Sequence, residues 1–141
     1  RHLVRRGESG VITVTGGKLT TYRRMAQDAV DLISDKPCRT TQVALVGAGP
    51  APPALALPAR LIRRYGAEAA RVASLADEHP QLLEPLTPEI GVRGVELVFA
   101  VRCEGARSID DVLERRTRVS LVPSDLAAAA PRAKEILDEF T

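Results

Sequence analysis

The residues with the clearest capacity for chemistry lie in the stretch SGVITVTGGKLTTYRRMAQDAVDLI, residues 9–33. The run VITVT at 11–15 is rich in β-branched residues and predicts a strand, which ends at two glycines and Lys18. Beyond the lysine, apolar residues recur at helical spacing as far as Ser34. A strand end, a glycine turn and a helix N-terminus together present unpaired N–H groups and the positive end of a helix dipole.

Such a turn can hold a group that carries or gains negative charge. A phosphate is one such group. The pyrimidine side of a flavin ring is another, because it gains negative charge on reduction and nearby donors then raise its potential. Lys18 adds a mobile positive charge at the same place. From the pattern alone, a flavin site, a phosphate site and a tight structural turn all remain open.

A second glycine-containing motif, VALVGAGPAPPAL, is similar to the start of a dinucleotide-binding fingerprint. Pro52 and Pro53 argue against a dinucleotide-binding site, because prolines lack the N–H groups that should point at a pyrophosphate. We interpret the motif as a rigid linker with a short extended piece at 43–46. An NAD-binding α/β protein built on Gly47 to Pro52 is kept as an alternative, and it requires a parallel strand beside 43–46.

The composition excludes several functional classes. A hydrophobic content of 45% with 27% charged residues is ordinary for a soluble globular protein. The net charge is only +2, and the paired arginines lie among apolar or acidic residues without aromatic residues to stack on bases. We therefore expect no nucleic-acid partner and interpret the arginine pairs as solvated helix faces.

The cysteine and histidine residues predict neither a metal site nor a disulfide. Cys38 and Cys103 are 65 positions apart, and His2 and His79 are equally isolated. Free thiols in a reducing cytoplasm are the simplest interpretation. The sequence contains no run of about 18 apolar residues and no signal-peptide pattern. Because the first residue is Arg1 and not methionine, we expect the chain to begin inside a longer protein.

The rest of the chain predicts helices that could position or cover such a site. A proline-rich segment occupies 36–58, and helical periodicity follows at 59–65, 67–78, 92–103, 109–116 and 125–140. Ser108 and Ser124 are the expected N-caps of the last two helices, and Pro131 predicts a kink or a break. We expect residues 59–141 to form a helical bundle, in which each large buried aliphatic contributes roughly 1.5 to 3 kcal/mol. The predicted core is Leu61, Ile62, Val72, Leu75, Val95, Val98, Phe99, Val112, Leu113, Ile136 and Leu137.

Several of these motifs together resemble FAD-dependent glycerol-3-phosphate dehydrogenases. GVITVTGGKLTTYRRMAQDAVD resembles the segment that closes the FAD-binding domain of that family. RYG at 64–66, VELVFAVRCEGARSIDDVLERRTR at 95–118 and SLVPSD after it resemble its C-terminal helical domain. The order and spacing agree over nearly the whole chain, whereas the linker and residues 80–92 match only loosely.

The resemblance implies a mainly α chain in three parts. Residues 1–35 would be the C-terminal end of the FAD-binding α/β domain, closing it with a strand, a turn and a helix. Residues 36–58 would be the linker, and residues 59–141 the C-terminal helical domain. The N-terminal GxGxxG unit that holds the ADP part of FAD is absent from this sequence, so we expect the chain alone to be inactive and to hold no FAD.

The resemblance also implies a reaction and a set of site residues. The full-length protein would oxidise sn-glycerol 3-phosphate to dihydroxyacetone phosphate, with FAD as cofactor and a membrane quinone as acceptor. Gly16, Gly17, Lys18, Leu19 and Thr20 would contact the flavin. Lys18 would also lie near the substrate, and Arg1 resembles an arginine that helps to hold the substrate phosphate.

Partners and location follow from the same resemblance. The implied partners are the rest of the FAD-binding domain, the substrate and the quinone, with a homodimer left open. The implied location is cytoplasmic, including a peripheral position on the inner face of the plasma membrane. A different class of function also remains: a non-catalytic helical interaction module with its contact face at 113–118. Whether oxygen or quinone accepts the electrons is not determined by the sequence.

Overall fold

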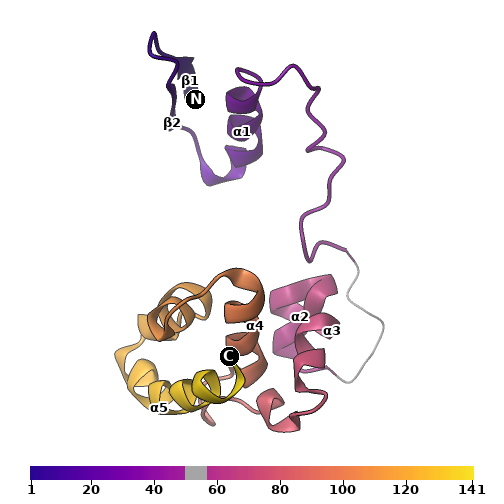
Figure 1. Ribbon diagram of the computed structural model, residues 1–141, viewed down its shortest axis with the longest axis vertical. Coiled ribbons are helices and arrows are strands. Elements are labelled where there is room, and N and C mark those ends of the chain that lie inside the picture. The colour runs from indigo at the N-terminus through magenta and orange to yellow at the C-terminus, as the bar shows by residue number, and fades with distance from the viewer. Residues whose placement is uncertain (50–56) are drawn as a thin grey trace. The chain divides into compact units, whose positions relative to one another are not determined.

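The chain forms two compact units, Arg1–Leu45 and Val46–Thr141, in a computed structural model that describes residues 1–49 and 57–141 (Figure 1). Pro52 and Pro53 of the glycine-proline motif lie outside the described residues. The described residues are mainly helical, with one two-stranded sheet, which confirms the predicted fold class. Two residues of the expected linker are each bonded to one unit: the Thr40 hydroxyl accepts a hydrogen bond from Arg23, and the Gly47 carbonyl accepts one from the N–H of Ala67.

The first unit begins with a β-hairpin. Strand β1 (His2–Arg6) pairs antiparallel with β2 (Ile12–Gly16), with His2 opposite Gly16 and Arg6 opposite Ile12. The turn is closed by the N–H of Gly7, which donates to the Val11 carbonyl at 2.8 Å. The predicted strand at 11–15 therefore has a sheet neighbour within this chain. The arginine-rich β1 pairs with it, although its sequence alone carries no clear strand pattern.

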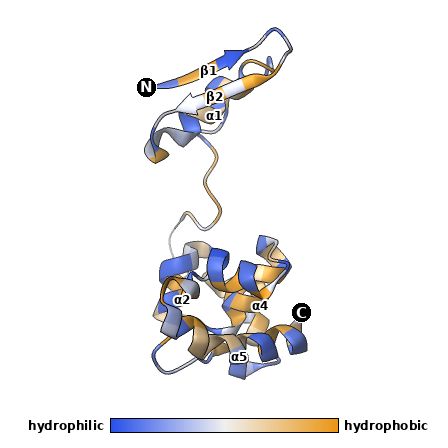
Figure 2. Cartoon of the chain, turned by 90° about the vertical axis from the view of Figure 1, so that its left-hand side faces the viewer, coloured by the Kyte–Doolittle hydropathy of each residue, from blue (hydrophilic) through white to orange (hydrophobic). Residues whose placement is uncertain are grey.

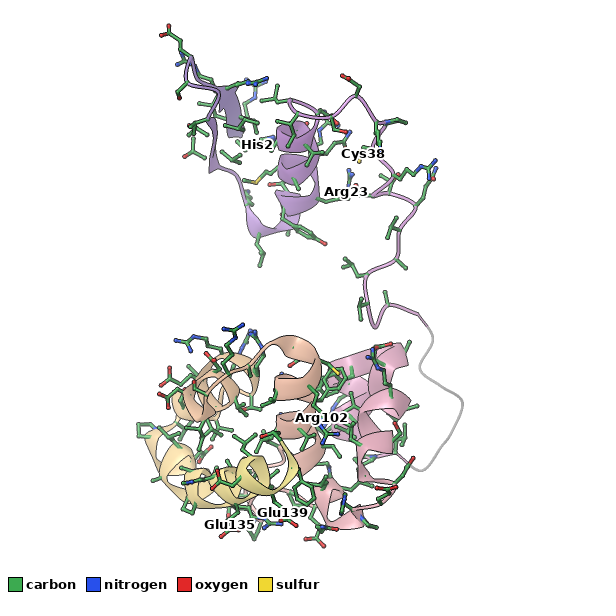
Figure 3. The ribbon with its side chains drawn as sticks, in the orientation of Figure 1. His2, Arg23, Cys38, Arg102, Glu135 and Glu139 are labelled. Atoms are coloured by element: carbon green, nitrogen blue, oxygen red, sulfur yellow. The ribbon has the colours of Figure 1, made fainter. Side chains whose placement is uncertain are left out.

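A helix follows the hairpin and is joined to it by an ion pair. A 3₁₀ turn, η1 (Leu19–Thr21), leads into α1 (Tyr22–Val30), which ends four residues before the expected end at Ser34. His2 on β1 lies toward α1 and contacts Asp28 at 2.6 Å, and Arg24 contacts the other oxygen of the same carboxylate at 2.9 Å (Figure 3). No residue of β1, β2 or α1 is buried, so this unit has no apolar core of its own.

The second unit is a helical bundle around α4 (Gly94–Glu104). Seven consecutive α4 residues, 94–100, are buried, and the helix is mostly hydrophobic along its length (Figure 2). The elements before it are α2 (Ala59–Tyr65), η2 (Gly66–Glu68), α3 (Ala69–Ala73), η3 (Ser74–Ala76) and η4 (Pro80–Leu83). Those after it are η5 (Asp111–Arg116), η6 (Val119–Leu121) and α5 (Pro123–Phe140).

The predicted core is largely confirmed. Ile62, Leu75 and Leu137 are only partly buried and pack against the core from its edge. The other eight predicted residues are buried: Leu61, Val72, Val95, Val98, Phe99, Val112, Leu113 and Ile136. Helical periodicity identified them because each helix presents one apolar face to the same centre.

Two predicted helices have a different form. The single helix expected at 67–78 is divided into η2, α3 and η3, and the Ser74 hydroxyl donates to the Arg71 carbonyl at 2.9 Å where α3 ends. Such back-bonding by serine competes with the regular helix ladder. The 109–116 segment widens into a π-turn, η5, because both the N–H and the hydroxyl of Thr117 donate to the Val112 carbonyl five residues earlier, each at 2.8 Å.

Three local expectations also need correction. The backbone bends at 43 and turns at 46, and residues 44–45 have no regular secondary structure, so no strand forms where the short extended piece was expected. Ser124 does not cap α5, which begins one residue earlier at Pro123, a residue suited to the first helical position.

The helix α5 continues through Pro131 without a break. The carbonyl that would have bonded to the proline N–H belongs to exposed Ala127, where water can solvate it. The predicted Ser108 cap is confirmed, because its Oγ accepts from the N–H of Asp111 at 3.1 Å.

Candidate functional site

The glycine turn of the first unit has a backbone that only glycine accommodates. Gly16 and Gly17 have φ values of 74° and 86°, in the region that side chains disfavour. A Cβ atom at Gly17 would overlap the Met25 sulfur, and one at Gly16 would lie 3.0 Å from the Arg1 carbonyl oxygen. The two glycines therefore bring β1, β2 and α1 together at one point.

Hydrogen bonds after the glycines leave two donors unpaired. Thr21 Oγ1 accepts from the N–H of Lys18 at 3.1 Å and donates to the Lys18 carbonyl at 2.8 Å. The N–H groups of Leu19 and Thr20 open the helix and bond to no other group within the described part of the chain. The turn can thus present two N–H groups, together with the exposed side chain of Lys18, to an anion or an electron-rich ring.

The hairpin register places the predicted site residues at one end of the sheet. Because His2 is opposite Gly16, Arg1 lies beside the glycine turn, and its carbonyl approaches Gly16 closely. The register therefore brings Arg1 next to the segment 16–20, although 14 residues separate Arg1 from Gly16 in sequence. Sequence analysis named these residues but not β1, whose pairing brings them together.

A second polar cluster lies in the helical unit and was not predicted. Glu96 is 1% exposed in the first turn of apolar α4. Its carboxylate contacts Arg60 Nε at 2.7 Å and Arg64 Nε at 3.4 Å, and it accepts a hydrogen bond from the N–H of Arg93 at 3.0 Å. We call Glu96, Arg60 and Arg64 the Glu96 cluster. Its sequence signal is an acidic residue in an apolar helix and two arginines four positions apart.

Tyr65 lies next to this cluster with its hydroxyl unpaired. Tyr65 is 8% exposed, and its ring packs edge-on against the Phe99 ring with the two ring centroids 5.4 Å apart. Its hydroxyl has no hydrogen-bond partner among the described residues. Burial raises the pKa of Tyr65 to about 12, and the negative charges of Glu96 and Glu104 act in the same direction, whereas Arg64 opposes them. The neutral phenol is therefore the form that the folded chain favours.

We expect the chain to lose stability as the pH rises from about 10 to about 12, and the Tyr65→Phe variant to lose less. The raised pKa means that the folded state holds a proton that the unfolded state releases above pH 10, so the stabilisation is present below pH 10 and is lost through pH 12. The difference should reach on the order of 2 kcal/mol. Urea unfolding at stepped pH measures it, and equal losses in both proteins would contradict the assignment to Tyr65.

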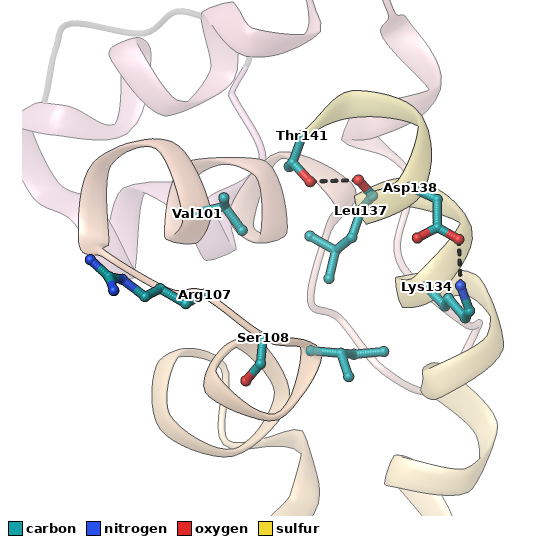
Figure 4. Close-up of a pocket in the computed structure, with 8 residues that line it drawn as sticks. Val101, Arg107, Ser108, Lys134, Leu137, Asp138 and Thr141 are labelled. Atoms are coloured by element: carbon teal, nitrogen blue, oxygen red, sulfur yellow. Dashed lines mark hydrogen bonds and ion pairs between the residues drawn. The ribbon is translucent and has the colours of Figure 1, made fainter.

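A pocket of about 330 Å³ lies between α4, α5 and the segment before η5 (Figure 4). Its apolar wall includes Val101, Ile109 and Leu137. Of its charged residues, Lys134 and Asp138 pair with each other at 2.5 Å, and Arg107 forms no ion pair within the described residues, so the pocket offers one guanidinium to a ligand. This pocket has no arrangement that points to a specific chemistry.

Two alternative functions find little support in the structure. The NAD-binding alternative required a parallel strand beside 43–46, but the described residues contain only the antiparallel β1–β2 sheet. On the proposed contact face of an interaction module, Arg115 pairs with Asp111, and Arg116 donates twice to the Glu104 carbonyl at 2.7 and 3.1 Å. These arginines are thus already engaged within the unit.

The described residues contain neither a cluster of metal ligands nor a membrane-spanning helix. No group of three or more His, Cys, Asp or Glu side chains there could hold a metal ion. None of the helices described is both long and apolar enough to cross a membrane. Cys38 and Cys103 are free thiols.

Comparison with known proteins gives the family. The chain is 46% identical over 148 residues to glycerol-3-phosphate dehydrogenase 1 of Mycobacterium tuberculosis (strain ATCC 25618 / H37Rv), covering 96% of this chain and 28% of the relative. It is 37% identical to glycerol-3-phosphate dehydrogenase of Mycobacterium leprae (97% and 26% covered). It is 31% identical to that of Synechocystis sp. (88% and 26% covered). No solved structure matches the chain.

The chain therefore spans little more than a quarter of the length of these relatives. The match to the mycobacterial relative necessarily includes most of residues 1–37, because it covers 96% of this chain. Residues 38–140 match the family model described as the C-terminal domain of alpha-glycerophosphate oxidase. This chain belongs to that family.

Proposed function

We propose that this chain is the C-terminal part of an FAD-dependent glycerol-3-phosphate dehydrogenase that oxidises sn-glycerol 3-phosphate to dihydroxyacetone phosphate. The observation that carries the proposal is the glycine turn, which gathers Arg1, Lys18 and two open N–H groups at one end of the hairpin. The relatives named glycerol-3-phosphate dehydrogenase match across both units, which supports the same reaction here.

The first unit has the properties of a segment that completes a larger domain. It contains no buried residue in β1, β2 or α1, and its exposed apolar residues include Leu3, Val14 and Tyr22. An isolated two-stranded hairpin is marginally stable in water, so these surfaces need a partner. We propose that the partner is the rest of the FAD-binding domain.

The residues at the turn fit a flavin ring. The absence of a side chain at Gly17 lets the turn pack closely against Met25 and His2, and Leu19 and Thr20 offer N–H donors. The N–H of Lys18 is already bonded to Thr21, so Lys18 would act through its ammonium group. When bound, FAD would accept the hydride from the substrate carbon. The donors and Lys18 would stabilise negative charge at the pyrimidine edge, and Gly16 would hold the strand end in place.

The substrate phosphate would be held by Arg1 and Lys18. Both are exposed, and Arg1 is placed beside the turn by the register of β1. A guanidinium provides paired hydrogen bonds to a phosphate, and a lysine adds a point charge. These two cations would orient the substrate so that its hydroxyl-bearing carbon faces the flavin.

The electron acceptor and the location extend the same proposal. We propose a quinone as acceptor, because the family's dehydrogenases pass electrons into the membrane. We propose a cytoplasmic location, peripheral on the inner face of the plasma membrane, where the enzyme would reach a quinone dissolved in the bilayer. A homodimer is compatible with this arrangement and is not required by it.

The test compares this chain with a longer protein. We expect the 141 residues, mixed with excess FAD and freed of unbound flavin, to hold far less than one FAD per chain and to show no dye reduction with glycerol 3-phosphate. A chimera that joins the upstream part of the Mycobacterium tuberculosis relative to Arg1 should be yellow, and the substrate should bleach it. A chimera that folds and binds FAD but is not bleached would contradict the proposal.

A further inference from the structure

Three arginines of α2 surround a shallow surface hollow. Arg60, Arg63 and Arg64 line a space of about 180 Å³, which corresponds to the volume of about six water molecules. The side chains of Arg60 and Arg64 are 32% and 30% exposed, and Arg63 is exposed. All three guanidinium groups are therefore accessible from solvent.

Most of their hydrogen-bond donors are unused. Arg60 and Arg64 each direct Nε to Glu96, and one Nη of Arg64 donates to the Arg116 carbonyl. Arg63 makes no ion pair or hydrogen bond with the described residues. Glu96 is the one carboxylate that pairs with these arginines among the described residues, and Glu68 and Glu104 line a neighbouring pocket with Arg63 and Arg64.

The buried carboxylate holds two of the guanidinium groups in position. Glu96 has no exposed side-chain surface, and burying a charge is costly unless partners compensate for it. Glu96 Oε1 accepts a hydrogen bond from Nε of Arg60, whereas Oε2 lies 3.4 Å from Nε of Arg64 and accepts no hydrogen bond from the described residues. Arg60 is thus held by a hydrogen bond and Arg64 by an ion pair, and each keeps donors free for another partner. Arginines fixed in this way lose less side-chain entropy on binding an anion than free surface arginines do.

We propose that Arg60, Arg63 and Arg64 form a binding site for a phosphate-type oxyanion, either a soluble phosphate ester or the head group of an anionic lipid. The planar donors of arginine match phosphate oxygens in pairs. The site lies on the helical unit, and its existence does not depend on the enzymatic activity proposed above.

The first experiment titrates the ¹⁵N-labelled 141-residue chain with inorganic phosphate and follows the NMR signals of α2. We expect saturable shifts with a Kd of about 1 mM, as befits an open site. Arg63→Gln should weaken binding about three- to fivefold, the effect of one exposed charge pair. Arg107→Gln removes the same charge from an exposed position elsewhere and should leave the Kd unchanged. Equal losses in the two variants, or no saturable shift, would overturn the proposal.

The Glu96→Gln variant separates positioning from charge. It makes the hollow more positive, so a site that depends on charge alone would bind phosphate more tightly. We expect weaker binding, because the guanidinium groups of Arg60 and Arg64 lose their fixed orientation. Tighter binding by a folded Glu96→Gln chain would contradict this positioning role, and if the variant does not fold, the Arg63 and Arg107 pair decides the question.

A vesicle assay distinguishes the two sources of phosphate. Phosphatidylcholine vesicles with and without phosphatidylglycerol are sedimented with the chain and with both arginine variants. Sedimentation that requires the anionic lipid and falls only in Arg63→Gln supports a head-group site. Phosphate binding without such sedimentation supports a soluble ester, and the absence of both overturns the site.

Discussion

Replacing Lys18 with alanine in the full-length flavoprotein proposed above should lower kcat/KM for glycerol 3-phosphate by about 100-fold and shift the flavin potential downward. Lys18 would supply positive charge where the reduced flavin and the substrate phosphate are both negative, and one such electrostatic contact in an active site accounts for about this factor. Loss of a cation that favours the reduced anion makes reduction less favourable. Steady-state kinetics and a dye-equilibrated redox titration measure the two effects.

Two further variants control for this experiment. Lys18→Arg keeps the charge, so it should retain more activity than Lys18→Ala and should shift the flavin potential less. Lys36→Ala removes an exposed lysine from the same unit and should change neither. Unchanged kinetics and an unchanged potential in Lys18→Ala would return Lys18 to the role of an exposed turn residue.

Glu96→Ala should lower the free energy of unfolding by about 2 to 4 kcal/mol. The substitution removes the acceptor of the Arg93 N–H at the start of α4 and the partner of two arginines. Loss of a helix cap alone costs about 1 kcal/mol, and breaking a buried ion pair costs more. The expected loss of stability is smaller than the largest losses that follow from breaking a buried ion pair, because Arg60 and Arg64 are partly exposed and water can solvate them.

Urea unfolding followed by circular dichroism measures this change, because most of the helical signal comes from the second unit. Glu114→Ala is the matched control, since Glu114 is exposed and forms no ion pair within the described residues. We expect it to change stability by less than about 0.5 kcal/mol. A loss for Glu96→Ala as small as that for Glu114→Ala would show that the cluster does not stabilise the fold.

Local patterns in the sequence determined the features that depend on neighbouring residues. The bounds 59–65 predicted for α2 are those observed, because Gly66, with a φ of 54°, ends the helix. Helical spacing also predicted most of the core of the helical unit, because each helix turns one apolar face inward. The glycine turn was recognised because two glycines after a β-branched run restrict the backbone to few conformations. The family resemblance, and not the pattern, singled out the flavin among the groups that such a turn could hold.

The tertiary structure alone decided the features that depend on distant residues. Pairing of β1 with β2 brings Arg1 to the glycine turn and His2 to Asp28, 26 positions away. Glu96 meets Arg60 across 36 positions, and no local pattern encodes that contact. A buried carboxylate is stable only where the packing of two helices places cations and an N–H group around it. The candidate turn could thus be predicted from the sequence, whereas the arginine hollow forms only because α2 and α4 pack together.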